Sequence, residues 1–285
     1  MVEDNVVFNN GQDGIELSSL ETAIATRNVV MMNGTEDSGQ DGIRLLSCDS
    51  SQVNFNQVFA SGGDGIVVRS SGVTSVTDNY VEGCGDQGIF VWILDQAFVA
   101  RNFSGDNSST GMILRNIDDL TCDNNVTVQN EGDGIQVRSS FAIVNGITSI
   151  QNNANGFTSS GNDLIEISNS IFRGNSNVQI GENLFGEIPI VNNSNIEGGY
   201  DGVGNIDSDP LFVSPDGADG NPNTVSDNDY RLLPGSPCID TGDSTSWLCA
   251  ELDVLSNPRV LDGLLDGNAI ADTVSYTHLT LPTKA

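Results

Sequence analysis

Apolar residues recur along this chain in short alternating stretches, and the stretches return at a fixed distance. GGDGIVVRS (62–70) has close copies before and after it, among them GQDGIRL and EGDGIQV. A glycine precedes the apolar pair in each copy, and most of these glycines are 23 residues apart. A period of this length indicates a solenoid, in which each repeat is one unit that stacks on the next. The marker glycines are Gly14, Gly42, Gly65, Gly88, Gly111, Gly134 and Gly156.

Each copy predicts one short β-strand. The first and third residues after the glycine are almost always apolar, which is the period-two alternation of a strand with one buried face. A helix would need a 3.6-residue period and fewer glycines. The predicted inward residues are Ile15, Ile43, Ile66, Ile89, Met112, Ile135 and Phe157, followed by Leu17, Leu45, Val68, Val91, Leu114, Val137 and Ser159.

Asparagines form two further columns with the same period. The first column is Asn5, Asn28, Asn56, Asn79, Asn102 and Asn125, and the second is Asn10, Asn33, Ser61, Cys84, Asn107 and Asn130. In the next repeat we expect the corresponding column residues at Asn145, Thr148, Ile150 and Asn153. Recurrence of one residue type at one place predicts parallel coils in register, about 4.8 Å apart, with stacked amides that hydrogen-bond along the axis.

We therefore predict an all-β fold, a parallel β-solenoid over residues 1–190, with an irregular C-terminal cap over 191–273. The spacings and the asparagine columns resemble the right-handed parallel β-helix of pectate-lyase-like proteins, over roughly residues 2–190. This resemblance implies a right-handed parallel β-helix with about 23 residues per coil, and many different functions occupy that scaffold. Because the chain begins in mid-repeat, we expect further coils to be missing at the N-terminus.

The C-terminal run GNIDSDPLF…YRLLPGSPCIDTGD resembles the ending of bacterial secreted or surface β-helix proteins. It implies export, an extracellular or cell-surface location, and a cell-envelope anchor beyond the C-terminus. It implies no reaction. The final residues 274–285, VSYTHLTLPTKA, resemble a translated sequencing adapter and are expected to be non-native. They hold the one histidine, His278, and the one lysine, Lys284.

Composition narrows the classes of partner. The formal net charge is −29, which argues against nucleic acid, because phosphate binding needs clustered basic side chains. No stretch is long enough for a membrane span of about 20 apolar residues. The five cysteines lack the paired spacing of a zinc site. Cys238 and Cys249 either form a disulfide in an oxidising compartment or remain thiols.

The outward positions of the Gly-Ile strands carry the main binding candidates. These candidates are Arg44, Arg69, Trp92, Arg115 and Arg138. Evenly spaced guanidinium groups suit the carboxylates or sulfates of an acidic polysaccharide, and a sugar ring can stack on the indole. The competing interpretation is a solvated face. In that case the arginines pair with the aspartates of the neighbouring turns, Asp13, Asp41, Asp64 and Asp133.

Three functions remain open at this stage. The leading hypothesis is a non-catalytic binding or adhesion module for acidic polysaccharide. The second is a polysaccharide lyase or glycoside hydrolase of the pectate-lyase-like type, for which the resemblance implies calcium-binding acids with a basic residue, or an aspartate cluster with a histidine. The native part of the chain has no histidine or lysine, so Arg115 or Arg138 would be the base, and Asp118, Asp119 and Asp123 form the densest acidic patch. The third is a passive surface spacer.

One loop is a candidate for calcium, the only cofactor expected. Hard oxygen ligands on a glycine-rich loop suit this ion, although the spacing differs from an EF-hand. The alternative is a polar surface loop. The candidate ligands are Asp216, Asp219, Asn221, Asp227 and Asp229.

Overall fold

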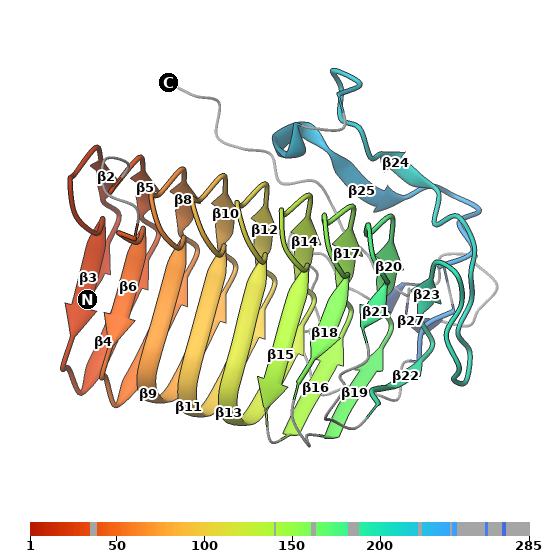
Figure 1. The fold of residues 1–285 in the computed structure, drawn as a ribbon, viewed down its shortest axis with the longest axis horizontal. Helices are drawn as coiled ribbons and strands as arrows, with labels where there is room; N and C mark the ends of the chain where they lie inside the picture. The colour runs from red at the N-terminus through yellow and green to blue at the C-terminus, as the bar shows by residue number, and fades with distance from the viewer. Residues whose placement is uncertain are drawn as a thin grey trace.

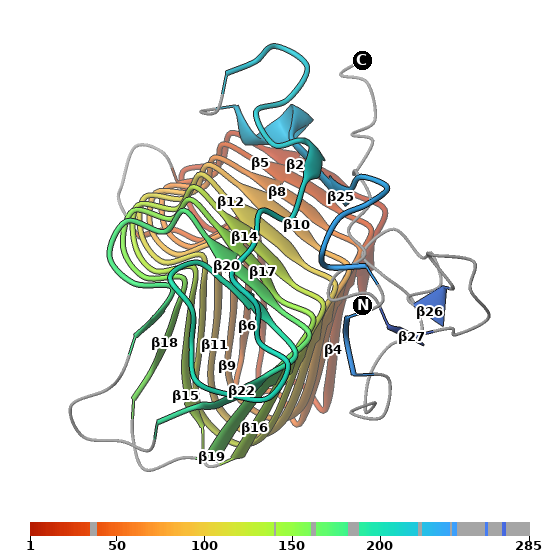
Figure 2. The same ribbon diagram turned by 90° about the vertical axis from the view of Figure 1, so that its right-hand side faces the viewer.

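The computed structural model describes residues 1–34, 39–139, 141–160, 164–181, 188–221, 224–239, 241–243, 260–261 and 270–271. Within these residues the chain winds into a stack of coils that runs from the N-terminal to the C-terminal end (Figure 1). Successive coils superimpose when viewed along the stack (Figure 2). The pairs between coils are parallel, and most are offset by 23 residues. The predicted all-β parallel solenoid is confirmed.

Each coil contributes strands to three faces. The Gly-Ile face consists of β3 (Ile15–Ser18), β6 (Ile43–Leu46), the first parts of β9 (Ile66–Thr77), β11 (Ile89–Ala100) and β13 (Met112–Asp123), then β15 (Ile135–Ser139), β18 (Phe157–Ser159) and β21 (Ile180–Gly181). The second face consists of β1 (Val2–Glu3), β4 (Thr22–Thr26), β7 (Ser50–Asn54), the later parts of β9, β11 and β13, then β16 (Phe141–Asn145), β19 (Leu164–Ser168) and β22 (Ile190–Asn192). The third face consists of β2 (Val6–Phe8), β5 (Val29–Met31), β8 (Gln57–Phe59), β10 (Tyr80–Glu82), β12 (Phe103–Gly105), β14 (Val126–Val128), β17 (Thr148–Ile150), β20 (Ile171–Arg173) and β23 (Asn195–Ile196).

The core lies inside the coils and is built from the predicted columns. Ile89, Val91, Met112 and Leu114 are all completely buried. The strands β9, β11 and β13 are 12 residues long and bend from the Gly-Ile face onto the second face, which joins both faces into one 14-stranded sheet. Parallel stacking therefore places most residues of one coil beside their counterparts in the next.

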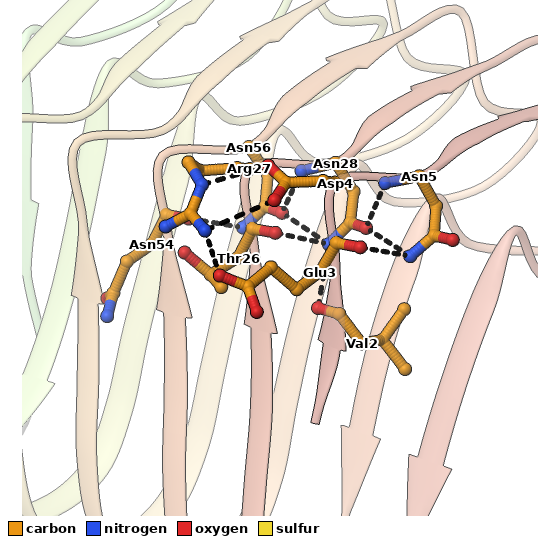
Figure 3. Close-up of polar contacts among 9 residues, drawn as sticks. All are labelled: Val2, Glu3, Asp4, Asn5, Thr26, Arg27, Asn28, Asn54 and Asn56. Carbon is orange, nitrogen blue, oxygen red and sulfur yellow. Dashed lines mark hydrogen bonds and ion pairs between the residues drawn. The ribbon is translucent and has the colours of Figure 1, made fainter.

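The asparagine columns form the predicted ladders. Asn79 donates its backbone N–H and its Nδ2 to Oδ1 of Asn102, at 3.1 and 2.9 Å, and Asn102 does the same to Asn125 at 3.0 and 3.0 Å. Figure 3 shows the N-terminal end of this ladder at Asn5 and Asn28. The amides satisfy buried backbone groups at the turn, where an unpaired group would cost about 1–3 kcal/mol.

The register shifts by one residue between the fifth and sixth coils, and four column positions expected from the sequence are therefore wrong. Arg115 pairs with Arg138, whereas Ile117 pairs with Ser139, so the turn at this point is one residue shorter than in the preceding coil. The residues that take the core, turn, third-face and second-ladder positions are Val144, Ile147, Ser149 and Asn152, in place of Asn145, Thr148, Ile150 and Asn153.

The C-terminal segment packs against the outside of the third face. Tyr80 and Phe103 stack there with ring centroids 4.5 Å apart, and Val225, Tyr230 and Cys238 close over this face in one buried apolar cluster. The segment contains β24 (Phe212–Ser214), a short 3-10 helix η1 (Val225–Asp227) and β25 (Asp229–Leu232), and two further strands, β26 (Val260–Leu261) and β27 (Ile270–Ala271), follow. β24 and β25 lie outside the C-terminal coils (Figure 1).

Two of the sequence-based expectations fall outside the part of the chain that the structure describes. Cys238 is buried, but Cys249 is not among the described residues, so the disulfide stays a prediction. The same holds for the tail 274–285. In the described residues no helix is long and apolar enough to cross a membrane.

Candidate functional site

The outward residues of the Gly-Ile face form one straight column across five coils. Leu46, Arg69, Trp92, Arg115 and Arg138 are aligned by the pairing of β6, β9, β11, β13 and β15. Neighbouring members are therefore separated by one strand spacing of about 4.8 Å. The structure thus brings together four of the five predicted binding residues, and we call Arg69, Trp92, Arg115 and Arg138 the Arg/Trp ladder.

Trp92 is sandwiched between two guanidinium groups. The guanidinium carbon of Arg69 lies 4.2 Å from the centroid of the Trp92 ring, and that of Arg115 lies 4.7 Å from it. Phe90 stacks beside the indole at 5.8 Å, with ring planes 7° apart. Cation–π contacts of this kind are worth about 0.5–2 kcal/mol each. They hold Arg69, Trp92 and Arg115 together without an acidic partner among the described residues.

The arginines of the ladder lack counter-ions among the residues that the structure describes. In the described ranges, no carboxylate lies within ion-pair distance of Arg69, Arg115 or Arg138, whereas Arg101 pairs with Asp78 at 2.7 Å. Arg115 and Arg138 face each other directly across two strands, and such like-charged pairs are destabilising. An anion bound over the column would relieve that repulsion.

Arg44 differs from the other predicted residues. It lies in the neighbouring outward column, opposite Val67, and its Nη1 is 3.6 Å from Asp13 and 3.9 Å from Asp41. The interpretation in which arginines pair with turn aspartates is therefore correct for Arg44. It does not describe the Arg/Trp ladder.

These turn aspartates form a ladder of their own. Oδ1 of Asp13 accepts the backbone N–H of Asp41 at 2.7 Å, Oδ1 of Asp41 accepts that of Asp64 at 3.0 Å, and Oδ1 of Asp64 accepts that of Gln87 at 2.8 Å. Burial raises the pKa of Asp41 to about 6 and that of Asp64 to about 7, and the neighbouring carboxylates add to both effects. Arg44 and the backbone donors oppose them only in part.

A groove of about 680 Å³ runs along the bend next to the Arg/Trp ladder. One lining residue, Ile93, directly follows Trp92. The groove is also lined by three aspartates from different coils, which are Asp49, Asp95 and Asp118. The sequence-based prediction did not identify this groove. The recurrence of aspartate at one column position was the available signal, but the bend that makes the groove could not be seen in the sequence.

The acidic patch expected at residues 118–123 is divided by the sheet. Asp118 and Asp119 are exposed, whereas Asp123 is completely buried and accepts a hydrogen bond from Asn145 at 2.8 Å. The three carboxylates therefore point to different environments. Across the described parts of the chain, no group of three or more histidine, cysteine, aspartate or glutamate side chains is arranged to hold a metal ion.

The candidate calcium loop has other contacts for several of its oxygens. Oδ2 of Asp227 accepts the backbone N–H groups of Ala218 and Asp219 at 2.8 and 3.2 Å. Oδ1 of Asp219 accepts the N–H of Asn221 at 2.8 Å. Asp229 forms an ion pair with Arg231. Asp219 and Asp227 thus lie close together, and calcium binding by Asp216, Asp219, Asn221, Asp227 and Asp229 stays a prediction.

Comparison with known proteins agrees with the fold. A family described as the right handed beta helix region matches residues 33–162. The chain therefore contains a right-handed parallel β-helix, as the resemblance in the sequence implied. No curated protein matches the sequence. Among solved structures, the crystal structure of the periplasmic alginate epimerase AlgG is similar, with 14% sequence identity and a TM-score of 0.42. The match covers 65% of this chain and 50% of that one, so this chain spans half the length of that neighbour.

Proposed function

We propose that this protein is a binding module for acidic polysaccharide and that the Arg/Trp ladder is its binding surface. The observation that carries the proposal is the sandwich of Trp92 between Arg69 and Arg115. Aromatic and guanidinium groups are fixed there at intervals of one coil, and the arginines lack carboxylate partners among the described residues. The arginines offer charge-assisted hydrogen bonds to the acidic groups of a sugar, and the half-buried indole offers an apolar contact at its edge.

The charge of the whole protein makes this surface exceptional. With a net charge of −29, the protein as a whole repels polyanions. Arg69, Arg115 and Arg138 therefore form a local positive surface on an acidic protein, and the repulsion between Arg115 and Arg138 would be relieved by a bound anion. The same surface is less useful to a passive spacer, for which the acidic partners seen at Arg44 and Arg101 would suffice.

The test is retention of the full chain on immobilised polysaccharides. Polygalacturonate, dextran sulfate and unmodified dextran serve as carboxylated, sulfated and neutral probes. We expect retention on at least one of the charged polymers and none on dextran. In R69Q/R115Q, loss of two charge-assisted contacts is expected to weaken retention at least about tenfold.

The matched control is R27Q/R231Q. It changes the net charge by the same amount, and both of its arginine side chains are about half exposed, at 51% and 49%. We expect this variant to be retained nearly as well as the unmodified chain. Equal losses in the two double variants, or no retention of the unmodified chain on any charged polymer, would exclude the ladder as the binding surface.

The same incubation separates binding from catalysis. New chain ends in the polymer, lost in R115Q or R138Q but kept in R27Q, would establish the lyase or hydrolase alternative instead. We propose an extracellular or cell-surface location as well. Its support is the resemblance of the C-terminal run to the ending of secreted and surface β-helix proteins, and fractionation of cells that express the intact gene tests it.

A further inference from the structure

The groove beside the ladder has a chemical character opposite to that of the ladder. Asp49, Asp95 and Asp118 line it together with the uncharged polar side chains of Ser47 and Asn116. All three aspartates are exposed. In the described ranges, none of them forms an ion pair or a side-chain hydrogen bond. Their charges are therefore available to whatever enters the groove.

Ile93 forms the step between the ladder and the groove. It has a φ of +59°, a backbone conformation that is unfavourable for a β-branched residue. In earlier coils this turn position is occupied by Ser19 and Ser47, with the same positive φ. Ile93 is also 42% exposed. An exposed isoleucine in a strained backbone conformation adds little to the stability of the fold. Residues with strain of this kind are common at binding sites.

Within one coil, the ladder residue, Ile93 and the groove residue follow one another along the strand, and each has its counterpart in the next coil. Trp92 is followed directly by Ile93, and Asp95 comes two residues later. One coil on, the same order recurs as Arg115, Asn116 and Asp118. A ligand that lies along the coils thus meets cations on one side, the apolar side chain of Ile93 in the middle and carboxylates on the other side.

We propose that Asp95 and Asp118 make this surface selective for acidic glycans whose sugar rings carry a charged group on one edge and hydroxyl groups on the other. This inference rests on the proposed function of the ladder. Carboxylates accept hydrogen bonds from hydroxyl groups and repel anions. A sugar ring with one acidic edge and one hydroxyl edge therefore fits, with its apolar face against Ile93 and the edge of the Trp92 indole. A glycan sulfated on both edges meets repulsion in the groove, a form of selectivity achieved by rejecting the wrong ligand.

The experiment compares affinities of the full chain for polygalacturonate and for dextran sulfate. We expect the unmodified chain to bind polygalacturonate at least about tenfold more tightly, because juxtaposed like charges weaken an interface by that order or more. In D95N/D118N the affinity for dextran sulfate should rise about tenfold, whereas that for polygalacturonate should stay the same or fall. In I93S, which restores the serine of earlier coils, binding of polygalacturonate should weaken.

The control is E131Q/D201N, which removes two exposed carboxylates elsewhere and changes the net charge equally. Equal affinities of the unmodified chain for both polymers, with D95N/D118N no different from this control, would overturn the selectivity and leave polysaccharide binding intact. Binding of neither polymer would instead refute the proposed function itself.

Discussion

The aspartate ladder makes the stability of this protein depend on pH in a predictable direction. Asp64 accepts the backbone N–H of Gln87 through Oδ1, and burial raises its pKa from 3.8 to about 7. Because the pKa is higher in the folded state than in the unfolded state, folding favours the protonated form. The contribution of Asp64 to stability is therefore fully present below about pH 4 and is lost as the pH rises through about 7.

Replacement of Asp64 by asparagine isolates this contribution. An amide keeps the Oδ1 acceptor, and Asn155 already occupies the same column position, where its Nδ2 donates to Asp133 at 2.8 Å. Between about pH 5 and pH 7 Asp64 is ionised in the unfolded chain and protonated in the folded one. Over this range the free energy of unfolding falls by about 1.4 kcal/mol for each pH unit. The advantage of D64N over the unmodified chain should therefore grow by about 2–3 kcal/mol between pH 5 and pH 8.

Urea unfolding at pH 5, 6, 7 and 8 measures this difference, with the exposed Glu21 as a control in E21Q. We expect the free energy of unfolding of the unmodified chain and of E21Q to decrease in parallel, and that of D64N to decrease less. If D64N and the unmodified chain show the same dependence on pH, Asp64 is ionised in the folded protein at no cost, and the argument from burial is wrong.

Three further substitutions, and G11A as a control for one of them, test the fold and the position of Ile93 by the same unfolding measurement. N102A removes the amide that bonds to Asn79, Asn125 and Val76, so it should lower the free energy of unfolding by about 2–4 kcal/mol; a loss below 1 kcal/mol would mean that the ladder is not essential. G88A should lower the free energy of unfolding by about 3 kcal/mol or more, because the added Cβ would lie 1.9 Å from Oγ of Ser104. In the control G11A the added Cβ meets nothing within 4 Å, so the free energy of unfolding should change by less than about 0.5 kcal/mol. Similar effects of the two substitutions would contradict the packing. I93N should stabilise the protein by about 1 kcal/mol, since asparagine tolerates a positive φ, while it weakens polysaccharide binding; destabilisation would show that Ile93 is not strained.

The repeat made the fold predictable because parallel coils convert sequence spacing directly into spatial contact. A glycine every 23 residues was sufficient to align Arg69, Trp92 and Arg115 on one face. The 23-residue spacing predicts column positions as far as Asn153, whereas the structure has the one-residue shift already at Ser139. Glycines mark only one point in each coil, so their spacing does not show which turn is shortened.

The electrostatic details of the site depended on side-chain packing that spacing does not reveal. Arg44 and Arg69 both lie on outward positions of the Gly-Ile face, yet only Arg44 is close to the turn aspartates. The packing of Tyr230 and Val225 on the third face joins segments more than one hundred residues apart, and no periodicity links them. The strained backbone of Ile93 was equally invisible, since the sequence alone suggests an ordinary strand residue there.

Fluorescence of Trp92 during titration with an acidic polysaccharide tests the central claim most directly. The chain has two tryptophans, Trp92 and Trp247, so W247F leaves Trp92 as the only indole reporter. We expect its emission to change saturably as polygalacturonate is added to W247F, and the change to be lost when R69Q and R115Q are added to that variant. Formation of a complex by light scattering with no change in Trp92 emission would contradict the account, because the polymer would then be bound away from the ladder.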